Sequence, residues 1–308
     1  MVLYLVPFAA AVIFIIAVVV RALKIRSLPI HLRWELYPVA HEKNARYGGS
    51  FFEQVDWWKK PRESSMAGEL GVMIPEILLL KGVHEHNRSL WWRSFPFHFG
   101  LYMLAGFVAL LLAGALAMAG NVEVGSAAHG FGLVLHWLTL IAGVGGCALL
   151  ALGSLALLLR RLSDPVLREY SAPADFLNLV LFLAAAVVAL AAWATADRDF
   201  FWLRGFFYGV VTFHFESGVP FPPLVVAEIV LGSVLIAYIP LTHMSHFFTK
   251  YFMWHDIRWD DKVNDKGGKM DARIKELLGQ KVSWSAPHIR GEGKKSWLDV
   301  ATEEVTKK

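Results

Sequence analysis

Few ionisable side chains lie inside the long apolar stretches of this sequence. They are His98, His136, Glu228, His243 and His246. Each is a candidate functional residue, because an ionisable group inside a bilayer is costly and usually has a specific role. His98 lies at the start of one apolar stretch and His246 near the end of another. Two neutral imidazoles on facing helices are the ligand set of a low-spin b-type haem. The pair is therefore a candidate haem site, and the alternative is two interfacial histidines at helix ends.

The elements that must position this pair are membrane-spanning helices. The 308 residues are 56% hydrophobic and have a mean hydropathy of +0.46, which is typical of an integral membrane protein. A helical span needs about 20 apolar residues, and the hydropathy profile predicts five spans, near 2–21, 97–119, 130–159, 175–196 and 224–248. The expected fold is an all-α bundle of five transmembrane helices. It places His98 and His246 at matching depths, on the second and fifth spans.

Basic residues orient the predicted bundle. The loop 24–96 is rich in Lys and Arg, whereas the connection 120–128 contains neither. Cytoplasmic loops carry an excess of basic residues, so the loop 24–96 is expected to be cytoplasmic, with the N-terminus outside and the C-terminus inside. The polar segment 249–308 is expected to form a cytoplasmic docking tail after a membrane domain 1–248, or a partly disordered tail. The isoelectric point near 9.1 reflects juxtamembrane charge and does not indicate nucleic-acid binding.

The polar segments are predicted to hold smaller elements. Short amphipathic helices are expected along the cytoplasmic surface within the loop 24–96, and a further amphipathic patch lies at 274–278 in the tail. The outer loop 197–222 is unusually aromatic and is expected to lie in the outer interface or to cover the bundle. Cys147 is the single cysteine. Because an iron–sulfur cluster usually needs four thiolates, any iron–sulfur chemistry requires a partner protein.

Four segments carry a resemblance to a known family. They are HLRWELYPVAHE at 31–42, SFPFHFGLYMLAG at 94–106, GSLALLLRRLSDPVLREYSAPADFLNLVLFL at 153–183 and GSVLIAYIPLTHMSHFFTKYF at 232–252. Through them most of the chain is similar to the gamma subunit of respiratory nitrate reductase and its relatives, which are membrane cytochromes b. The first two segments resemble most closely the branch that accompanies heterodisulfide-reductase-like iron–sulfur proteins.

The resemblance implies a place for each ligand of the family's inner haem. The histidine of the FHFG segment is His98, and the last histidine of the PLTHMSH segment is His246. His243 stands where relatives often have a basic residue, and it is the weaker candidate ligand. The haem propionates require cations at the cytoplasmic edge. The candidates there are Arg93, Arg160 and Arg161.

The resemblance also implies positions for the two histidines that bind the family's outer haem, and this sequence has no histidine at either of them. The two expected histidine positions hold Val108 and Glu228, and neither residue type suits a low-spin b-type haem. One haem b is therefore expected. The alternative is a second haem with relocated ligands, for which the candidates are His129, His136 and His214. Glu228 either accepts a proton from a quinol or fills the space of the lost haem.

The resemblance implies an electron-transfer subunit in a prokaryotic cytoplasmic membrane. Electrons are expected to pass between menaquinone and a heterodisulfide-reductase-like iron–sulfur subunit on the cytoplasmic face, with the haem as relay. Because about 30 Å of hydrocarbon separates the two faces, the quinone is expected near the inner haem. Glu228 and His243 are the candidate quinone or proton contacts. The alternative function is a haem-free membrane anchor that recruits a soluble redox enzyme.

Overall fold

Helices form nearly all of the regular structure. The computed structural model describes residues 2–28, 42, 51–61, 63, 65–215, 220–258, 266–283 and 293–303. Within these residues the regular elements are helices, apart from one isolated bridge between Lys281 and Ser296. The predicted all-α fold is confirmed. The segment 31–41, which carries part of the resemblance, lies outside the described residues.

Five helices in the described part of the chain are long and apolar enough to cross a membrane, as predicted. They are α1 (Val2–Ser27), α4 (Arg88–Ala119), α5 (Gly130–Ser163), α7 (Pro173–Thr195) and α9 (Pro223–Tyr238), which a 3-10 turn extends to Leu241. A helix satisfies its backbone hydrogen bonds internally, as the dry core of a bilayer requires. The chain is a multi-pass membrane protein.

The second span is longer than the sequence predicts. α4 begins at Arg88 and not near residue 97, because the side chain of Asn87 caps it by accepting a hydrogen bond from Leu90 N over 2.9 Å. Pro96 lies inside this helix and does not end it. His98 consequently lies about three turns into α4 and not in its first turn.

The fifth span differs from the prediction in the opposite direction. α9 ends at Tyr238, and two 3-10 turns within residues 239–245 separate it from α10 (His246–Phe252). Pro240 accounts for the end of the α-helix, since proline has no backbone N–H and its ring clashes with the preceding turn. His246 is therefore the first residue of a separate short helix, and it does not lie on a continuous fifth span.

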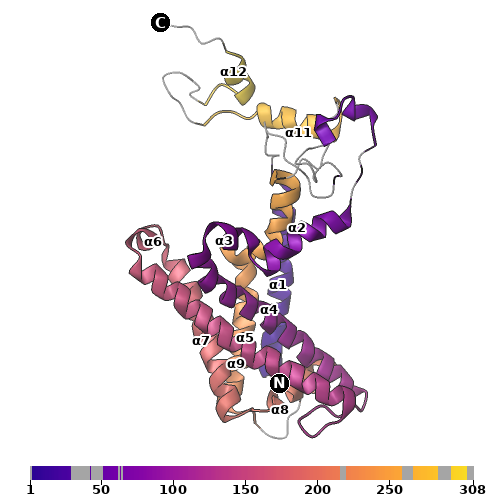
Figure 1. The fold of residues 1–308 in the computed structure, drawn as a ribbon, viewed down its shortest axis with the longest axis vertical. Helices are drawn as coiled ribbons and strands as arrows, with labels where there is room; N and C mark the ends of the chain where they lie inside the picture. The colour runs from indigo at the N-terminus through magenta and orange to yellow at the C-terminus, as the bar shows by residue number, and fades with distance from the viewer. Residues whose placement is uncertain are drawn as a thin grey trace. The chain divides into compact units, whose positions relative to one another are not determined.

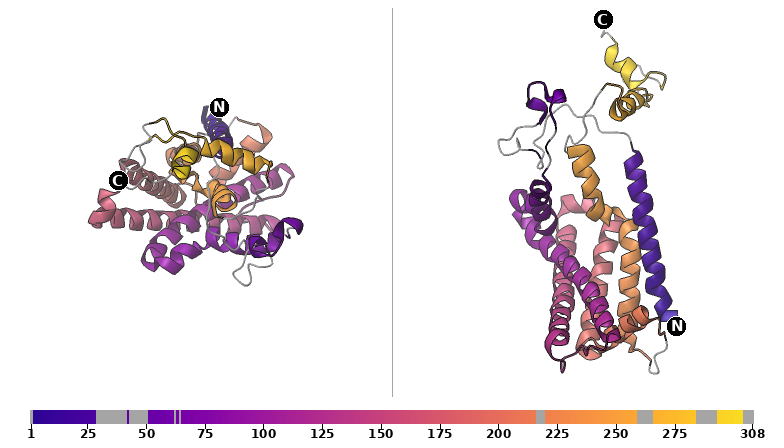
Figure 2. Two further views of the ribbon diagram at one scale, coloured as in Figure 1. Left: turned by 90° about the horizontal axis from the view of Figure 1, so that it is seen from above. Right: turned by 90° about the vertical axis from the view of Figure 1, so that its right-hand side faces the viewer.

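The chain divides into two compact units, Met1–Val18 with Ile74–Met244 and Val19–Met73 with Ser245–Lys308. In the first unit α4 packs against α5, α5 against α7, and α7 against α9, as the neighbouring ribbons in Figures 1 and 2 show. α8 (Phe201–Thr212) packs against α4. Two short helices, α3 (Lys81–His86) and α6 (Pro165–Glu169), complete this unit. The predicted division after residue 248 stays a prediction.

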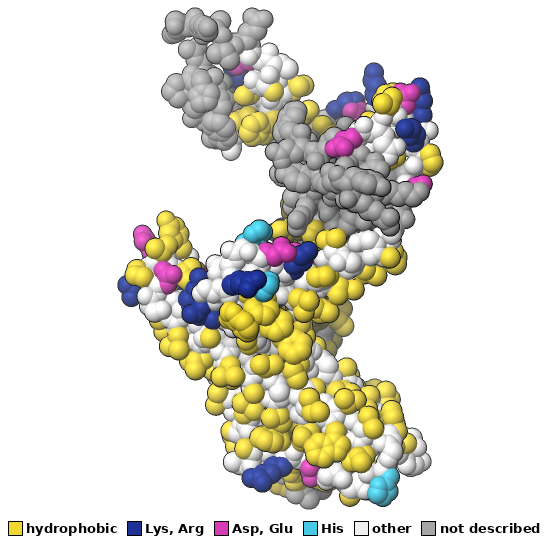
Figure 3. Space-filling view, viewed as in Figure 1, with side chains coloured by type: hydrophobic (Ala, Val, Ile, Leu, Met, Phe, Trp, Pro, Cys, Tyr) yellow, Lys and Arg dark blue, Asp and Glu magenta, His cyan; other side chains and the backbone are white. Residues whose placement is uncertain are grey.

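Two apolar clusters hold the first unit together. One contains Tyr4 of α1 and Phe206 of α8, whose rings stack with their centroids 4.6 Å apart. The other contains Phe97 of α4 and Phe182 of α7. Hydrophobic side chains also cover the outside of the helices, and Figure 3 shows them between two ends of the unit where charged side chains gather. A surface of this kind is suited to contact with lipid.

Gly100 lies where α4 and α5 approach each other closely. A Cβ at this position would lie 2.6 Å from Leu150 N and 2.9 Å from Gly146 O, which are both backbone atoms of α5. We expect Gly100→Val to separate the helices and to lower the free energy of unfolding by about 1–3 kcal/mol, seen as a lower melting temperature in detergent. Gly106→Val is the matched control, because a Cβ there would meet no described atom within 4 Å apart from the backbone of its own helix and its chain neighbours. Equal melting temperatures for the two variants would contradict this packing.

The second unit contains the end of α1, the start of α2 and the C-terminal elements. Its elements are η2 (Phe51–Glu53), η3 (Trp57–Lys59), α2 (Met66–Leu78), α10, a π-helix (Met253–Arg258), α11 (Lys269–Leu278) and α12 (Trp297–Thr302). Arg21 of α1 donates a hydrogen bond to Ser245, and His255 Nε2 lies 3.1 Å from Glu69 Oε1 of α2. α11 contains the amphipathic patch at 274–278.

Candidate functional site

The histidine of α4 is oriented by its own helix. His98 Nδ1 lies 2.8 Å from the carbonyl oxygen of Ser94 and 3.2 Å from Ser94 Oγ. Because a carbonyl oxygen only accepts hydrogen bonds, Nδ1 carries the ring proton and donates a hydrogen bond to Ser94 O. This tautomer has its lone pair on Nε2, and metal-bound histidines usually have such a hydrogen bond from the other ring nitrogen. The local geometry of His98 therefore suits an axial ligand.

The two histidines after α9 have different surroundings. His246 begins α10 and is exposed; it belongs to the second unit, whereas His98 belongs to the first. His243 Nε2 lies 3.7 Å from Asp175 Oδ1 at the start of α7, and the His243 side chain is 63% exposed. When it is protonated, His243 thus forms a surface ion pair with Asp175.

The three candidate propionate partners differ in their contacts. Arg93 Nη1 donates hydrogen bonds to Ser89 O over 2.5 Å and to Ser89 Oγ over 2.8 Å. Arg161 Nη1 lies 3.4 Å from Asp175 Oδ2. Arg160 Nη1, in contrast, is buried and has no hydrogen-bond partner among the described residues. A buried donor without a partner is costly, and the carboxylate of a bound group at this end of α5 would satisfy it.

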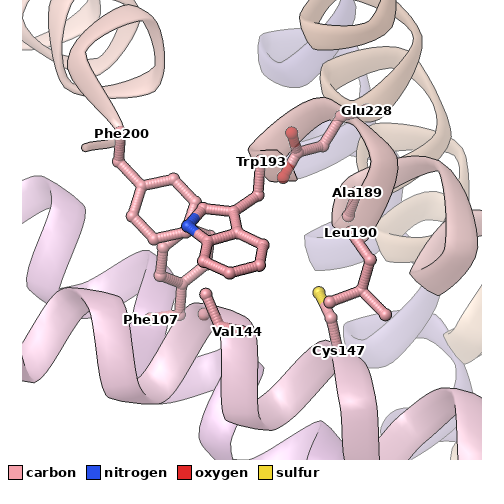
Figure 4. Close-up of a pocket in the computed structure, with 9 residues that line it drawn as sticks. Phe107, Val144, Cys147, Ala189, Leu190, Trp193, Phe200 and Glu228 are labelled. Carbon is pink, nitrogen blue, oxygen red and sulfur yellow. The ribbon is translucent and has the colours of Figure 1, made fainter. Parts of the chain in front are cut away.

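A small cavity lies among α4, α5, α7 and α9. Its lining includes Phe107, Val144, Cys147, Trp193, Phe200 and Glu228. Figure 4 shows the carboxyl group of Glu228 pointing toward the indole of Trp193, with the sulfur of Cys147 on the side of α5. A single carboxyl group therefore faces a mainly apolar and aromatic space within the membrane-spanning bundle.

The residues around this cavity do not fit a second haem. None of the residues that line it is a histidine, and the neighbouring Val108 has no ligand atom. The rings of Phe107 and Phe200 would come within 2.6 Å and 2.9 Å of a Cβ at Gly143, so aromatic side chains already pack closely against α5. The cavity that remains beside Glu228 is small.

The three histidines considered as relocated ligands lie in different surroundings. His129 precedes α5 and is exposed. His214 follows α8, is exposed, and its Nδ1 lies 3.0 Å from Thr212 O. His136 is 2% exposed and lies within α5, where its Nδ1 contacts Arg204. The three candidates therefore lie in three different surroundings, and a second haem with relocated ligands stays the alternative.

His136 belongs to a buried charged cluster that the sequence analysis did not identify. Arg204 Nη2 donates a hydrogen bond to His136 Nδ1 over 3.2 Å and another to the carbonyl oxygen of Asp199. His136 Nε2 lies 3.8 Å from Asp199 Oδ1. Arg204 is 4% exposed, and its Nη1 has no hydrogen-bond partner within the described part of the chain. The cluster lies where α8 packs onto α4 and α5.

Asp197 completes this cluster at the start of α8. Its two carboxylate oxygens accept hydrogen bonds from Trp202 N and Leu203 N, each over 3.0 Å, which stabilises the N-terminus of the helix. Burial raises the pKa of Asp197, while these hydrogen bonds and the charge of Arg204 oppose the rise. The available signal was the DRD triplet at 197–199 followed by Arg204 in an aromatic segment. These residues lie outside the predicted spans, where ionisable side chains are common and do not by themselves indicate a site.

A comparison with known protein families identifies the family of this chain. A family model described as nitrate reductase gamma subunit matches residues 83–258, more than half of the chain. This range includes α4 to α10 and both candidate haem ligands. Comparisons with curated proteins and with solved structures give no significant match. The chain therefore belongs to the nitrate reductase gamma subunit family, which comprises haem-containing membrane electron-transfer subunits of multi-subunit reductase complexes.

Proposed function

We propose that the chain relays electrons through one b-type haem between a quinone and an iron–sulfur subunit at the cytoplasmic face. In this proposal His98 and His246 are the axial ligands. The observation that carries it is the hydrogen bond from His98 Nδ1 to Ser94 O, because it presents Nε2 as the ligand nitrogen. A bound haem supplies reversible one-electron chemistry, and the protein supplies its position and electrostatics.

The assignment of His246 as the second axial ligand rests on the sequence. His246 is the last histidine of the PLTHMSH segment, which resembles the segment that supplies the inner haem ligand in the family. It follows the proline-induced end of α9, so its backbone is not constrained by that helix. His243 is the competing residue, and its contact with Asp175 already gives it a different role.

Arg160 is the most suitable propionate partner of the three arginines. Its buried Nη1 has no partner among the described residues, whereas Arg93 and Arg161 already donate hydrogen bonds within the protein. A guanidinium forms strong charge-assisted hydrogen bonds with a carboxylate. A haem propionate at this position would therefore offset the cost of burying the Arg160 donor.

One haem implies that the quinone site lies near it. Val108 and Glu228 occupy the positions of the outer haem ligands, and a site at the opposite face would leave a gap on the order of the 30 Å hydrocarbon thickness. We therefore place the quinone, for which menaquinone is our proposal, near the cytoplasmic end of the bundle and close to His243. Glu228 is assigned to proton exchange.

The cytoplasmic partner is a heterodisulfide-reductase-like iron–sulfur protein in this proposal. The chain has only Cys147 and cannot hold a cluster of its own. The excess of basic residues in the loop 24–96 supports a cytoplasmic position for that loop, and we propose the same side of a prokaryotic membrane for the C-terminal segment 249–308. These segments are the proposed docking surface.

A reduced-minus-oxidised absorption spectrum of the purified chain tests the proposal against a haem-free membrane anchor. Dithionite reduction should produce the bands of a low-spin b-type haem. A well-expressed, folded chain without these bands would instead act as an anchor that recruits a soluble redox enzyme.

The choice between His246 and His243 is open to a direct test. We expect His243→Ala to keep the haem, because the His243 side chain is largely exposed and its Nε2 lies 3.7 Å from Asp175 Oδ1, with which it forms an ion pair when protonated. Loss of an exposed ion pair should change the free energy of unfolding by less than about 1 kcal/mol. Haem content per chain measures the outcome. A haem-free His243→Ala protein together with a haem-loaded His246→Ala protein would reverse the assignment.

A further inference from the structure

Buried donors without a partner gather at the end of the bundle where α5 ends and α7 begins. Among the described residues, four buried side-chain nitrogen or oxygen atoms have no hydrogen-bond partner. Three of them are Ser154 Oγ, Arg160 Nη1 and Asn178 Nδ2, and the fourth belongs to Arg204 of α8. Arg160 is assigned above to a haem propionate, which leaves the other two. We propose that Ser154 and Asn178 bind the carbonyl oxygens of a quinone headgroup, and that Tyr238 positions the Asn178 amide.

The Asn178 amide is oriented by a contact with α9. The Tyr238 hydroxyl donates a hydrogen bond to Asn178 Oδ1 over 2.8 Å, so Nδ2 is the amide atom that remains to donate. The Asn178 side chain is buried, and its Nδ2 has no partner among the described residues. A buried donor in this state is costly, and an acceptor oxygen placed beside it would remove the cost.

Ser154 is the corresponding donor on α5, and its side chain is fully buried. Other buried hydroxyl groups of the spans bond to their own helix. Thr139 Oγ1 donates to the carbonyl oxygen four residues earlier over 2.6 Å, and Ser233 Oγ does the same over 2.7 Å. Within the described part of the chain Ser154 Oγ makes no such contact. Its hydroxyl is therefore available to a bound molecule.

Both donors face the interface between α5 and α7. Arg161 Nη1 of α5 lies 3.4 Å from Asp175 Oδ2 of α7, so these residues mark the facing sides of the two helices. Ser154 lies about two turns before Arg161 on the same side of α5. Asn178 lies about one turn after Asp175 on the same side of α7. Because α5 runs toward this end and α7 away from it, the two donors lie about one turn apart in depth.

Apolar side chains adjoin the two donors. Leu150 lies one turn from Ser154 on α5. Phe182 lies one turn from Asn178 on α7, and both apolar residues belong to the same buried cluster. Met244 packs against this cluster, and its unbranched side chain can adapt to a ligand. A few polar donors in an apolar and aromatic wall suit a flat ring that has two carbonyl oxygens.

The choice of a quinone as this ring rests on the proposed function. The site agrees with the quinone position proposed there, because His243 contacts Asp175, which lies one turn from Asn178. The alternative occupant is a buried water that both donors bind. A water would satisfy the same donors without an apolar ring, so the two occupants give different results when a quinone is added.

Infrared spectroscopy of the full-length chain in lipid nanodiscs tests the site. The probe is a short-chain menaquinone with isotope-labelled carbonyl groups. A hydrogen bond lowers the carbonyl stretching frequency, so the wild type should give a band below that of the same quinone in protein-free nanodiscs. We expect Asn178→Leu and Ser154→Ala each to remove part of this shift and to weaken binding about tenfold. Tyr238→Phe should reduce the shift as well, because it removes the contact that orients the amide.

Ser233→Ala is the matched control. It also removes a buried hydroxyl from a span, but Ser233 Oγ already donates to Ile229 O over 2.7 Å. The carbonyl band and the affinity should therefore equal those of the wild type. Melting temperatures in detergent without quinone control for folding. Ser154→Ala should be at least as stable as the wild type, because it removes a buried polar atom that has no partner among the described residues.

Two results would overturn the site. One is a wild-type chain that gives no shifted band, and the other is a shifted band and an affinity that Asn178→Leu and Ser154→Ala both retain. The second result would leave the proposed function standing, with the quinone bound elsewhere. If Asn178→Leu does not fold, Ser154→Ala and Tyr238→Phe decide. A chain without haem bands whose quinone band still depends on Ser154 and Asn178 would contradict the proposed relay and support the site.

Discussion

Replacement of His98 by alanine is expected to abolish haem binding. The purified variant should lack the b-type bands, because an axial ligand is lost and the hydrogen bond that orients it from Ser94 is lost with it. His246→Ala should give the same result. Measurement of haem by its pyridine haemochrome, relative to protein, follows both variants.

His129→Ala is the matched control for this experiment. His129 is exposed and precedes α5, so its removal should leave haem content unchanged. Ser94→Ala removes the hydroxyl contact at 3.2 Å but keeps the backbone acceptor at 2.8 Å, so it should retain the haem as well. Full haem in His98→Ala would exclude His98 as an axial ligand.

Arg204→Ala is expected to have the largest effect on stability. The substitution leaves Asp197 buried without its cationic neighbour and removes the hydrogen bond to His136. Breaking a buried charge cluster by removal of one partner costs about 3–5 kcal/mol. The variant should therefore melt at a clearly lower temperature in detergent and lose the packing of α8 on α4.

Arg198→Ala provides the comparison for Arg204→Ala. Arg198 is exposed and donates to Ala194 O over 3.1 Å, so its removal should change the free energy of unfolding by no more than about 0.5 kcal/mol. Limited proteolysis of the segment 201–212 would locate the damage in α8. If Arg204→Ala were as stable as Arg198→Ala, the cluster would contribute little to the fold.

The spanning helices could be predicted because their signal is local. Each span is a continuous apolar stretch, and its length relative to a bilayer identifies it without knowledge of its neighbours. The ends were less predictable. Asn87 caps α4 upstream of the apolar stretch, where hydropathy gives no signal. Pro240 ends α9 inside an apolar stretch, where hydropathy continues although the α-helix does not.

Some residues of the candidate site could likewise be predicted from the sequence, and others could not. His98 could be named from sequence, since a histidine at the edge of an apolar span is conspicuous, but its contact with Ser94 depends on the helix that carries both. The cluster of His136, Asp197 and Arg204 could not be named. Its members come from α5 and from a loop and helix about 60 residues later, and only packing brings them together.

The number of haem groups per chain tests the central claim most directly. Purified protein should contain one b-type haem per polypeptide, because His98 and His246 provide one ligand pair while Val108 and Glu228 occupy the positions of the second. A ratio near one agrees with the proposed relay. A ratio near two would require relocated ligands, and a ratio near zero in folded protein would contradict the haem relay altogether.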